Sequence, residues 1–211
     1  ADPLDARADR LELASIYLST EGGTDRARSL YRTLLEADPA DADALEALIA
    51  VELRDGNWAA AVDGLAYKID LVHESERPIL YRTMAEILQR HLGDPERAAN
   101  CLAQAMVLEP TNPDIMQALS EAYDALGRQR DLLDLLRHRA KSTDDSKVRV
   151  LLYERMIDLL EGPLQHAAAA EEVRGELEQE QRAARERALD DRALSSPTEE
   201  LTGTDILLDD P

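Results

Sequence analysis

The stretch GDPERAANCLAQAMVLEP, residues 93–110, contains most of the information that decides the fold. It opens on Gly93 and an Asp-Pro pair, in which the aspartate can accept hydrogen bonds from a helix N-terminus and the proline suits the first helical position. Ala98 and Leu102 follow four residues apart, which places them on one face of an amphipathic helix. Glu109-Pro110 stops that helix. The stretch therefore predicts a glycine turn followed by one amphipathic helix.

The same pattern recurs along the whole chain. Its glycines are separated by 34, 37, 34 and 35 residues: Gly22, Gly56, Gly93, Gly127 and Gly162. Five positions after each glycine comes a small residue, with one leucine as the exception: Ala27, Ala61, Ala98, Leu132 and Ala167. Nine positions after the first four comes a larger core residue: Tyr31, Leu65, Leu102 and Leu136. A period near 34 residues predicts a stacked array of helical hairpins.

The first four glycines are also each preceded by a helical apolar stripe, which supplies the first helix of the unit. The stripe residues are Leu11 and Ala14, Leu45 and Leu48, Tyr81, Met84 and Ala85, and Met116 and Leu119. Asp38-Pro39 ends one unit, and Asn112-Pro113 begins another with a capping side chain and a proline. The repeating unit is therefore expected to be a helix, a glycine turn and a second helix.

Residues 93–110 resemble the second half of a tetratricopeptide repeat, and residues 22–39 match it almost as well. The second unit keeps Gly56, Trp58 and Ala61 but has His73 where the closing proline would fall. The fourth unit lacks the small residue, and the fifth, from about Lys147, is assigned by continuity. The resemblance covers roughly residues 8–175. It implies an all-α fold, a right-handed α-solenoid of about five hairpins.

The domain organisation follows from this repeat and from a change of composition near the end. Residues 1–194 are expected to form one repeat domain, in which residues 164–194 make a long, largely polar capping helix. Residues 195–211 contain no basic residue and one short apolar island, so we expect a disordered acidic tail. The island Ile206-Leu207-Leu208 is either a short docking motif or part of a linker.

Composition narrows the classes of partner. The formal net charge is −20, from 44 acidic and 24 basic residues, which disfavours nucleic acids and anionic membranes and favours a monomer. No apolar run is long enough to span a membrane and no signal peptide is recognisable, so a cytoplasmic protein is expected. The single cysteine, Cys101, fits a reducing compartment and a core position. Abundant alanine and arginine suggest a bacterial source.

Residues with catalytic or metal-binding chemistry are scattered. The four histidines lie in different units, without a cysteine or second histidine at ligand spacing: His73, His91, His138 and His166. The turn at Gly22-Gly23 follows no strand and precedes no lysine, so it is not a phosphate-binding loop. We therefore expect no catalytic residues, no metal, no cofactor and no enzymatic activity.

The resemblance implies that the first helices line a concave groove that takes an extended or helical peptide of another protein. By spacing, the expected peptide-binding residues are Asp9, Glu12, Asp43, Glu46, Arg82, Glu86, Arg90, Gln117 and Glu121, with Ile16 and Ala50 beside them. The acidic first half favours a ligand segment with basic and apolar residues, unless these carboxylates are only solvated surface. The expected function is a protein interaction scaffold. The alternatives are an assembly module of a larger complex or an accessory domain of a regulatory protein.

Overall fold

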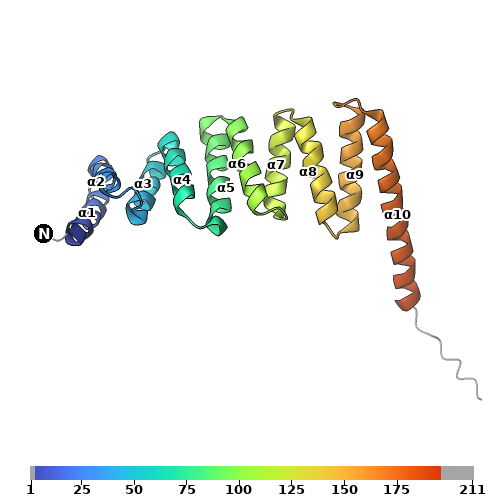
Figure 1. The fold of residues 1–211 in the computed structure, drawn as a ribbon, viewed down its shortest axis with the longest axis horizontal. Helices are drawn as coiled ribbons and strands as arrows, with labels where there is room; N and C mark the ends of the chain where they lie inside the picture. The colour runs from blue at the N-terminus through green and yellow to red at the C-terminus, as the bar shows by residue number, and fades with distance from the viewer. Residues whose placement is uncertain (1–2, 196–211) are drawn as a thin grey trace, which may run out of the picture. The chain divides into compact units, whose positions relative to one another are not determined.

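The computed structural model describes residues 3–195 of the chain (Figure 1). All regular elements in this range are helical, and none is a strand. The α-helices are α1 (Pro3–Leu18), α2 (Thr24–Ala37), α3 (Ala42–Arg54), α4 (Trp58–Leu71), α5 (Arg77–Ile87), α6 (Pro95–Leu108), α7 (Pro113–Ala125), α8 (Gln129–Ser142), α9 (Ser146–Glu161) and α10 (Ala167–Ser195). A 3-10 turn, Glu74–Glu76, precedes α5, and a π-helical turn, Leu88–Leu92, follows it. The expected all-α array of helical hairpins is confirmed.

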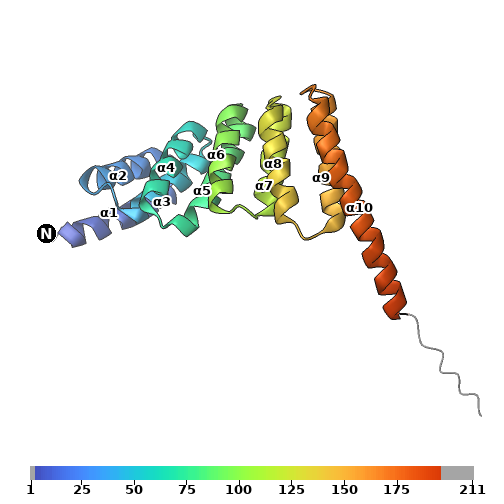
Figure 2. The same ribbon diagram turned by 45° about the vertical axis from the view of Figure 1, so that its right-hand side comes forward.

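The helices belong to two compact units, which divide within α8 between Leu135 and Leu136. In the first unit the hairpins α1–α2, α3–α4 and α5–α6 pack in sequence order through α2 against α3, α4 against α5, and α6 against α7. In the second unit α9 and α10 pack closely against each other (Figure 2). Each helix in the first unit thus contacts its sequence neighbours, as expected for a repeat array.

The repeated glycines of the first unit occupy left-handed backbone conformations, with φ angles of 61° to 75°. After α3, the Asn57 amide donates a hydrogen bond to the Glu52 carbonyl at 2.9 Å, and after α7 the Arg128 amide donates to the Tyr123 carbonyl at 2.8 Å. This closure of the helix end requires a residue with positive φ at the position of Gly56 and Gly127. The period therefore reflects a glycine with positive φ in each of four turns, and Gly56 and Gly127 also share the same closing hydrogen bond.

The fifth turn is different, and one predicted core position there is wrong. Gly162 has φ −83°, and Gln165 instead has positive φ, at 49°. α10 begins at Ala167, five residues after Gly162, whereas the second helix begins two residues after the glycine at the other four turns. Ala167 is consequently exposed, and Ala170, one turn later, is fully buried.

The other predicted core positions of the second helices are buried, whereas Leu11, Leu48 and Tyr81 of the first-helix stripes are only half-buried. The residue five positions after the glycine is at most 2% exposed at Ala27, Ala61, Ala98 and Leu132. The larger residues at the next turn of the same helices, Tyr31, Leu65, Leu102 and Leu136, are at most 6% exposed. Burial of each leucine contributes about 1.5–3 kcal/mol. The helix starts also agree with the sequence: Asp94 accepts a hydrogen bond from the Arg97 amide at 3.0 Å, and Asn112 accepts one from the Asp114 amide at 3.0 Å.

Candidate protein-binding surface

The first helices of the hairpins present the residues that the sequence assigned to the groove. Asp9 and Glu12 lie on α1, Asp43 and Glu46 on α3, Arg82 and Glu86 on α5, Arg90 on the following π-helical turn, and Gln117 and Glu121 on α7. All nine side chains are exposed. Exposure follows from helical periodicity, because these positions fall between those of the buried stripe.

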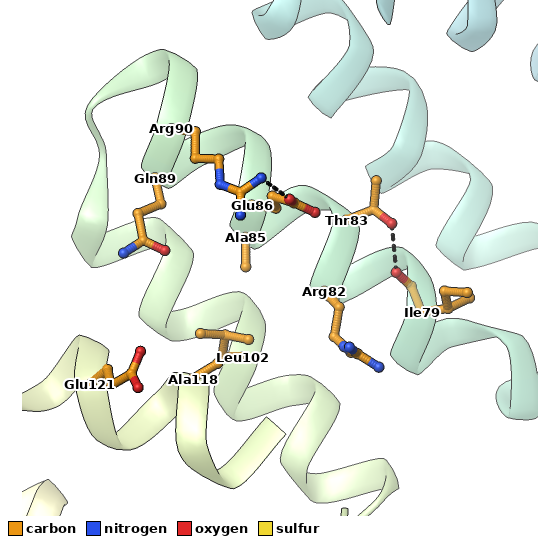
Figure 3. Close-up of a pocket in the computed structure, with 10 residues that line it drawn as sticks. All are labelled: Ile79, Arg82, Thr83, Ala85, Glu86, Gln89, Arg90, Leu102, Ala118 and Glu121. Atoms are coloured by element: carbon orange, nitrogen blue, oxygen red, sulfur yellow. Dashed lines mark hydrogen bonds and ion pairs between the residues drawn. The ribbon is translucent and has the colours of Figure 1, made fainter. Parts of the chain in front are cut away.

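A pocket of about 450 Å³ lies between α5 and α7 of the first unit (Figure 3). Arg82, Glu86, Arg90 and Glu121 line it, so the fold brings together four of the nine predicted residues. Gln117 lies next to it and donates a hydrogen bond to Glu121 at 2.7 Å. The four residues of α1 and α3 are not part of this pocket.

The rest of the pocket lining is mixed (Figure 3). Thr83 and Gln89 are polar, whereas Ala85 from α5, Leu102 from α6 and Ala118 from α7 are small or apolar. Ile79, also in the lining, is 65% exposed, which leaves an apolar surface open beside the charged groups. The small residues Ala85 and Ala118 leave room between the two helices. Ile79 was missing from the predicted set because it lies one turn before the positions counted from the glycine.

The charged groups of the pocket differ in whether another side chain already pairs with them. Glu86 and Arg90 form an ion pair one helical turn apart, and Glu121 accepts the hydrogen bond from Gln117. Arg82 makes no ion pair or hydrogen bond with any of residues 6–189, whose side chains are described. Arg82 is therefore the charge in this pocket that is free to pair with a ligand carboxylate.

The acidic surface of α3 is partly neutralised by the chain itself. Arg7 donates hydrogen bonds to Asp41 at 2.6 and 2.7 Å and to Asp43 at 2.7 Å, and Lys68 pairs with Glu46 at 3.1 Å. The bonds from Arg7 hold the pKa of the buried Asp41 carboxyl below its ordinary value. Asp9 and Glu12 make no such pair with a described residue. Of the four acidic groove residues predicted on the first two units, those without a described cationic partner are thus Asp9 and Glu12 of α1.

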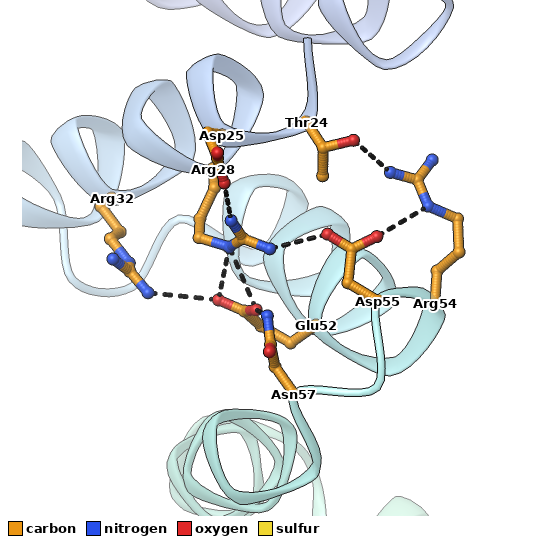
Figure 4. A network of polar contacts seen from close by, with 8 residues as sticks. All are labelled: Thr24, Asp25, Arg28, Arg32, Glu52, Arg54, Asp55 and Asn57. Carbon is orange, nitrogen blue, oxygen red and sulfur yellow. Dashed lines mark hydrogen bonds and ion pairs between the residues drawn. The ribbon is translucent and has the colours of Figure 1, made fainter. Parts of the chain in front are cut away.

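A second polar cluster joins α2 to α3 and includes a buried carboxylate (Figure 4). Glu52, only 2% exposed, accepts hydrogen bonds from Arg28 Nε at 3.1 Å to both oxygens and from Asn57 Nδ2 at 2.7 Å. Arg32 adds a contact at 3.2 Å, and Arg28 also pairs with Asp55 at 2.7 Å. Because Glu52 is hydrogen-bonded on both oxygens by its own fold, the cluster serves to hold α2, α3 and the following turn together.

The other candidate side chains, Trp58 and Cys101, are each partly buried against the fold. Trp58, at the start of α4, is half-buried and stacks on His91 with ring centroids 3.6 Å apart. Cys101 is half-buried rather than fully buried, and burial raises the pKa of its thiol, so little of it is thiolate at neutral pH. Over the part of the chain that is described, no three His, Cys, Asp or Glu side chains are grouped as a metal site requires.

Two further sequence-based expectations concern the C-terminal docking motif and membrane-spanning helices. The docking motif Ile206-Leu207-Leu208 lies outside the described residues. Between residues 3 and 195, none of the helices has the length and apolar character needed to cross a membrane.

The sequence matches no family model and no curated protein. Among solved structures, it is similar to MamA at 15% identity with a TM-score of 0.45, over 90% of this chain and 96% of that one. The TPR protein YrrB matches at 16% identity with a TM-score of 0.45, over 83% and 90% of the two chains. The TPR-like repeats of a Podosopora anserina putative kinesin light chain match at 16% with a TM-score of 0.42, over 87% and 99%.

At such low identities and TM-scores, these likenesses say nothing about the function of this chain. The hairpins of the first unit are tetratricopeptide-like in their own sequence spacing and backbone geometry. That geometry combines a period near 34 residues, a left-handed glycine between the two helices, and a buried small residue on the second helix.

Proposed function

We propose that this chain is a protein interaction scaffold, and that the pocket between α5 and α7 is the main contact site for a segment of a partner protein. The observation that carries the proposal is that an open pocket of mixed lining combines apolar side chains with an arginine that has no described partner. Ile79 and Leu102 offer contact to an apolar side chain, and Arg82 offers two-pronged hydrogen bonding to a carboxylate. A mobile water-exposed peptide would gain both kinds of contact at once.

The charges of α1 predict which residues the same ligand carries away from the pocket. Asp9 and Glu12 are exposed and not neutralised by a described cation, so they favour basic residues in the partner. The proposed ligand is therefore a segment with an apolar anchor, a carboxylate near that anchor, and basic residues toward α1. This keeps the basic and apolar character expected from the sequence and adds the group that faces Arg82.

Selection of peptides from a random display library on the full chain, followed by affinity measurement, tests this proposal. Arg82→Glu should weaken binding of the selected peptides by about tenfold or more. Arg97→Glu is the matched control, because Arg97 lies on α6, is also exposed and does not line the pocket. Equal effects of the two substitutions would reject the pocket as the site. An assembly module would instead show concentration-dependent self-association in sedimentation experiments without any added peptide.

A further inference from the structure

The second unit contains another open pocket, at the place where α10 meets the beginning of α9. Glu180 of α10 accepts a hydrogen bond from Ser146 Oγ at 2.5 Å and pairs with Arg149 Nε at 3.0 Å. α10 then continues to Ser195, beyond the N-terminal end of α9, as both ribbon views show (Figures 1 and 2). The two helices therefore form a corner, with α9 on one side and the free length of α10 on the other.

The pocket in this corner has a volume of about 410 Å³ and an apolar centre formed by Val150, Leu151 and Ala184. Leu151, on α9, is 64% exposed. Leu189, on α10 about one turn beyond Arg185, is also 64% exposed. Two exposed cations, Lys147 and Arg185, and one exposed carboxylate, Glu154, also line the pocket. An exposed leucine in a pocket with more cations than acids is suited to an apolar segment that carries negative charge.

The chain itself contains a segment of this chemistry. Residues 196–211 include the apolar triplet Ile206-Leu207-Leu208 and five acidic residues, and they contain no lysine or arginine. The acids stand on both sides of the triplet: Glu199, Glu200, Asp205, Asp209 and Asp210. The acids that adjoin the triplet could face Lys147 and Arg185 while the three apolar side chains contact Leu151.

The length of the segment is sufficient. From Ala184 to Ser195 the helix rises about 16 Å at about 1.5 Å per residue. The 11 residues from Ser195 to Ile206 can span up to about 36 Å when extended. The triplet can therefore return along α10 to the pocket with slack, and the short tether gives it a millimolar effective concentration there.

We propose that the acidic segment around Ile206-Leu207-Leu208 docks in the same molecule onto the pocket between α9 and α10. Val150, Leu151 and Ala184 form the apolar contact, and Lys147 and Arg185 face the flanking aspartates. The docked segment shields the exposed leucine of α9. This inference concerns the second unit and does not depend on peptide binding at the α5–α7 pocket.

Disulfide trapping in the full-length chain tests the proposal. In a Cys101→Ala background, one cysteine replaces Thr204 in the acidic segment and a second replaces Glu154, which lines the pocket. The matched control places the second cysteine at Glu186, which is exposed and lies on the other side of α10 from Gln181 and Ala184. Both versions lose one glutamate, and Glu186 is nearer to Thr204 along the chain.

Docking predicts that the intramolecular disulfide from Thr204→Cys to Glu154→Cys forms about tenfold faster than that to Glu186→Cys. Adding Leu207→Asp or Leu151→Asp should reduce the faster rate to that of the control. Equal rates at the two positions would overturn the proposal, because they would mean that the segment has no preferred site. Disulfides that form only between molecules would also overturn it, and would assign the pocket to a second copy of the chain. A faster rate that both aspartate substitutions leave unchanged would exclude the apolar contact proposed here.

Discussion

Gly64 on α4 lies so close to Ile49 on α3 that a Cβ atom added to the glycine would be 2.8 Å from Ile49 Cγ1. Ile49 is only 6% exposed and therefore has little room to move. In an exposed helix, alanine in place of glycine would stabilise by up to about 1 kcal/mol. Here we expect Gly64→Ala to lower the free energy of unfolding by about 1–3 kcal/mol, because the extra methyl group overpacks the α3–α4 contact.

Gly175 provides the matched control in a urea unfolding experiment. It also lies within a helix, α10, but an added Cβ would meet nothing within 4 Å. Gly175→Ala should therefore raise stability by up to about 1 kcal/mol. If both substitutions stabilise the protein, the close approach of α3 and α4 is not as described.

The ion pair between Arg7 and Asp41 predicts a specific response to acid. Asp41 has a lowered pKa when folded, so its ionised form stabilises the protein above the ordinary aspartate pKa of about 3.9, and this stabilisation is lost as the pH falls through the lower folded value. Asp41→Asn keeps a side-chain acceptor for the Ala44 amide but removes the charge that binds Arg7. We expect it to cost about 1–2 kcal/mol at neutral pH.

Measured from neutral pH downward, the stability difference between the wild type and Asp41→Asn should be constant to about pH 4 and shrink below it. The exposed Asp63, on α4, supplies the control substitution Asp63→Asn, which should show no such convergence. A difference that stays constant down to pH 2 would mean that the ion pair contributes nothing to stability.

The hairpin array could be predicted from the sequence because the residues that specify each hairpin lie close together in the chain. A left-handed glycine, a capping Asp-Pro or Asn-Pro, and residues four apart on one helix face act within about ten residues of one another. It failed at Ala167 because the sequence does not indicate that Gln165, rather than Gly162, takes the positive φ angle. The period alone therefore placed the core residue of α10 one turn too early.

The candidate site could be predicted only in part, because its electrostatics depend on contacts between repeats. Exposure of Arg82 and Glu121 follows from helical spacing, whereas their grouping around one pocket depends on how α5 and α7 are arranged. The neutralisation of Asp43 by Arg7 and of Glu46 by Lys68 joins residues 36 and 22 positions apart. No pattern within one helix indicates such pairs.

This difference between α1 and α3 leads to a prediction for ligand binding. Glu12→Lys should weaken the binding of a selected peptide that carries basic residues and flatten its salt dependence, because Glu12 is exposed and has no described cation beside it. Glu21→Lys makes the same change of charge in the turn after α1, outside the predicted groove, and should have a much smaller effect. Equal losses for the two variants would indicate a response to net charge alone, without contact at α1.

The most direct test of the proposed function is a methyl NMR titration of the full chain with a library-selected peptide. Ile79 lines the pocket between α5 and α7 and is 65% exposed, whereas Val107 on α6 is 72% exposed and lies outside that pocket. We predict that the methyl resonances of Ile79 and Leu102 shift in proportion to bound peptide while those of Val107 remain in place. Shifts at Val107 with none at Ile79 would contradict the proposal and place the binding site elsewhere on the first unit.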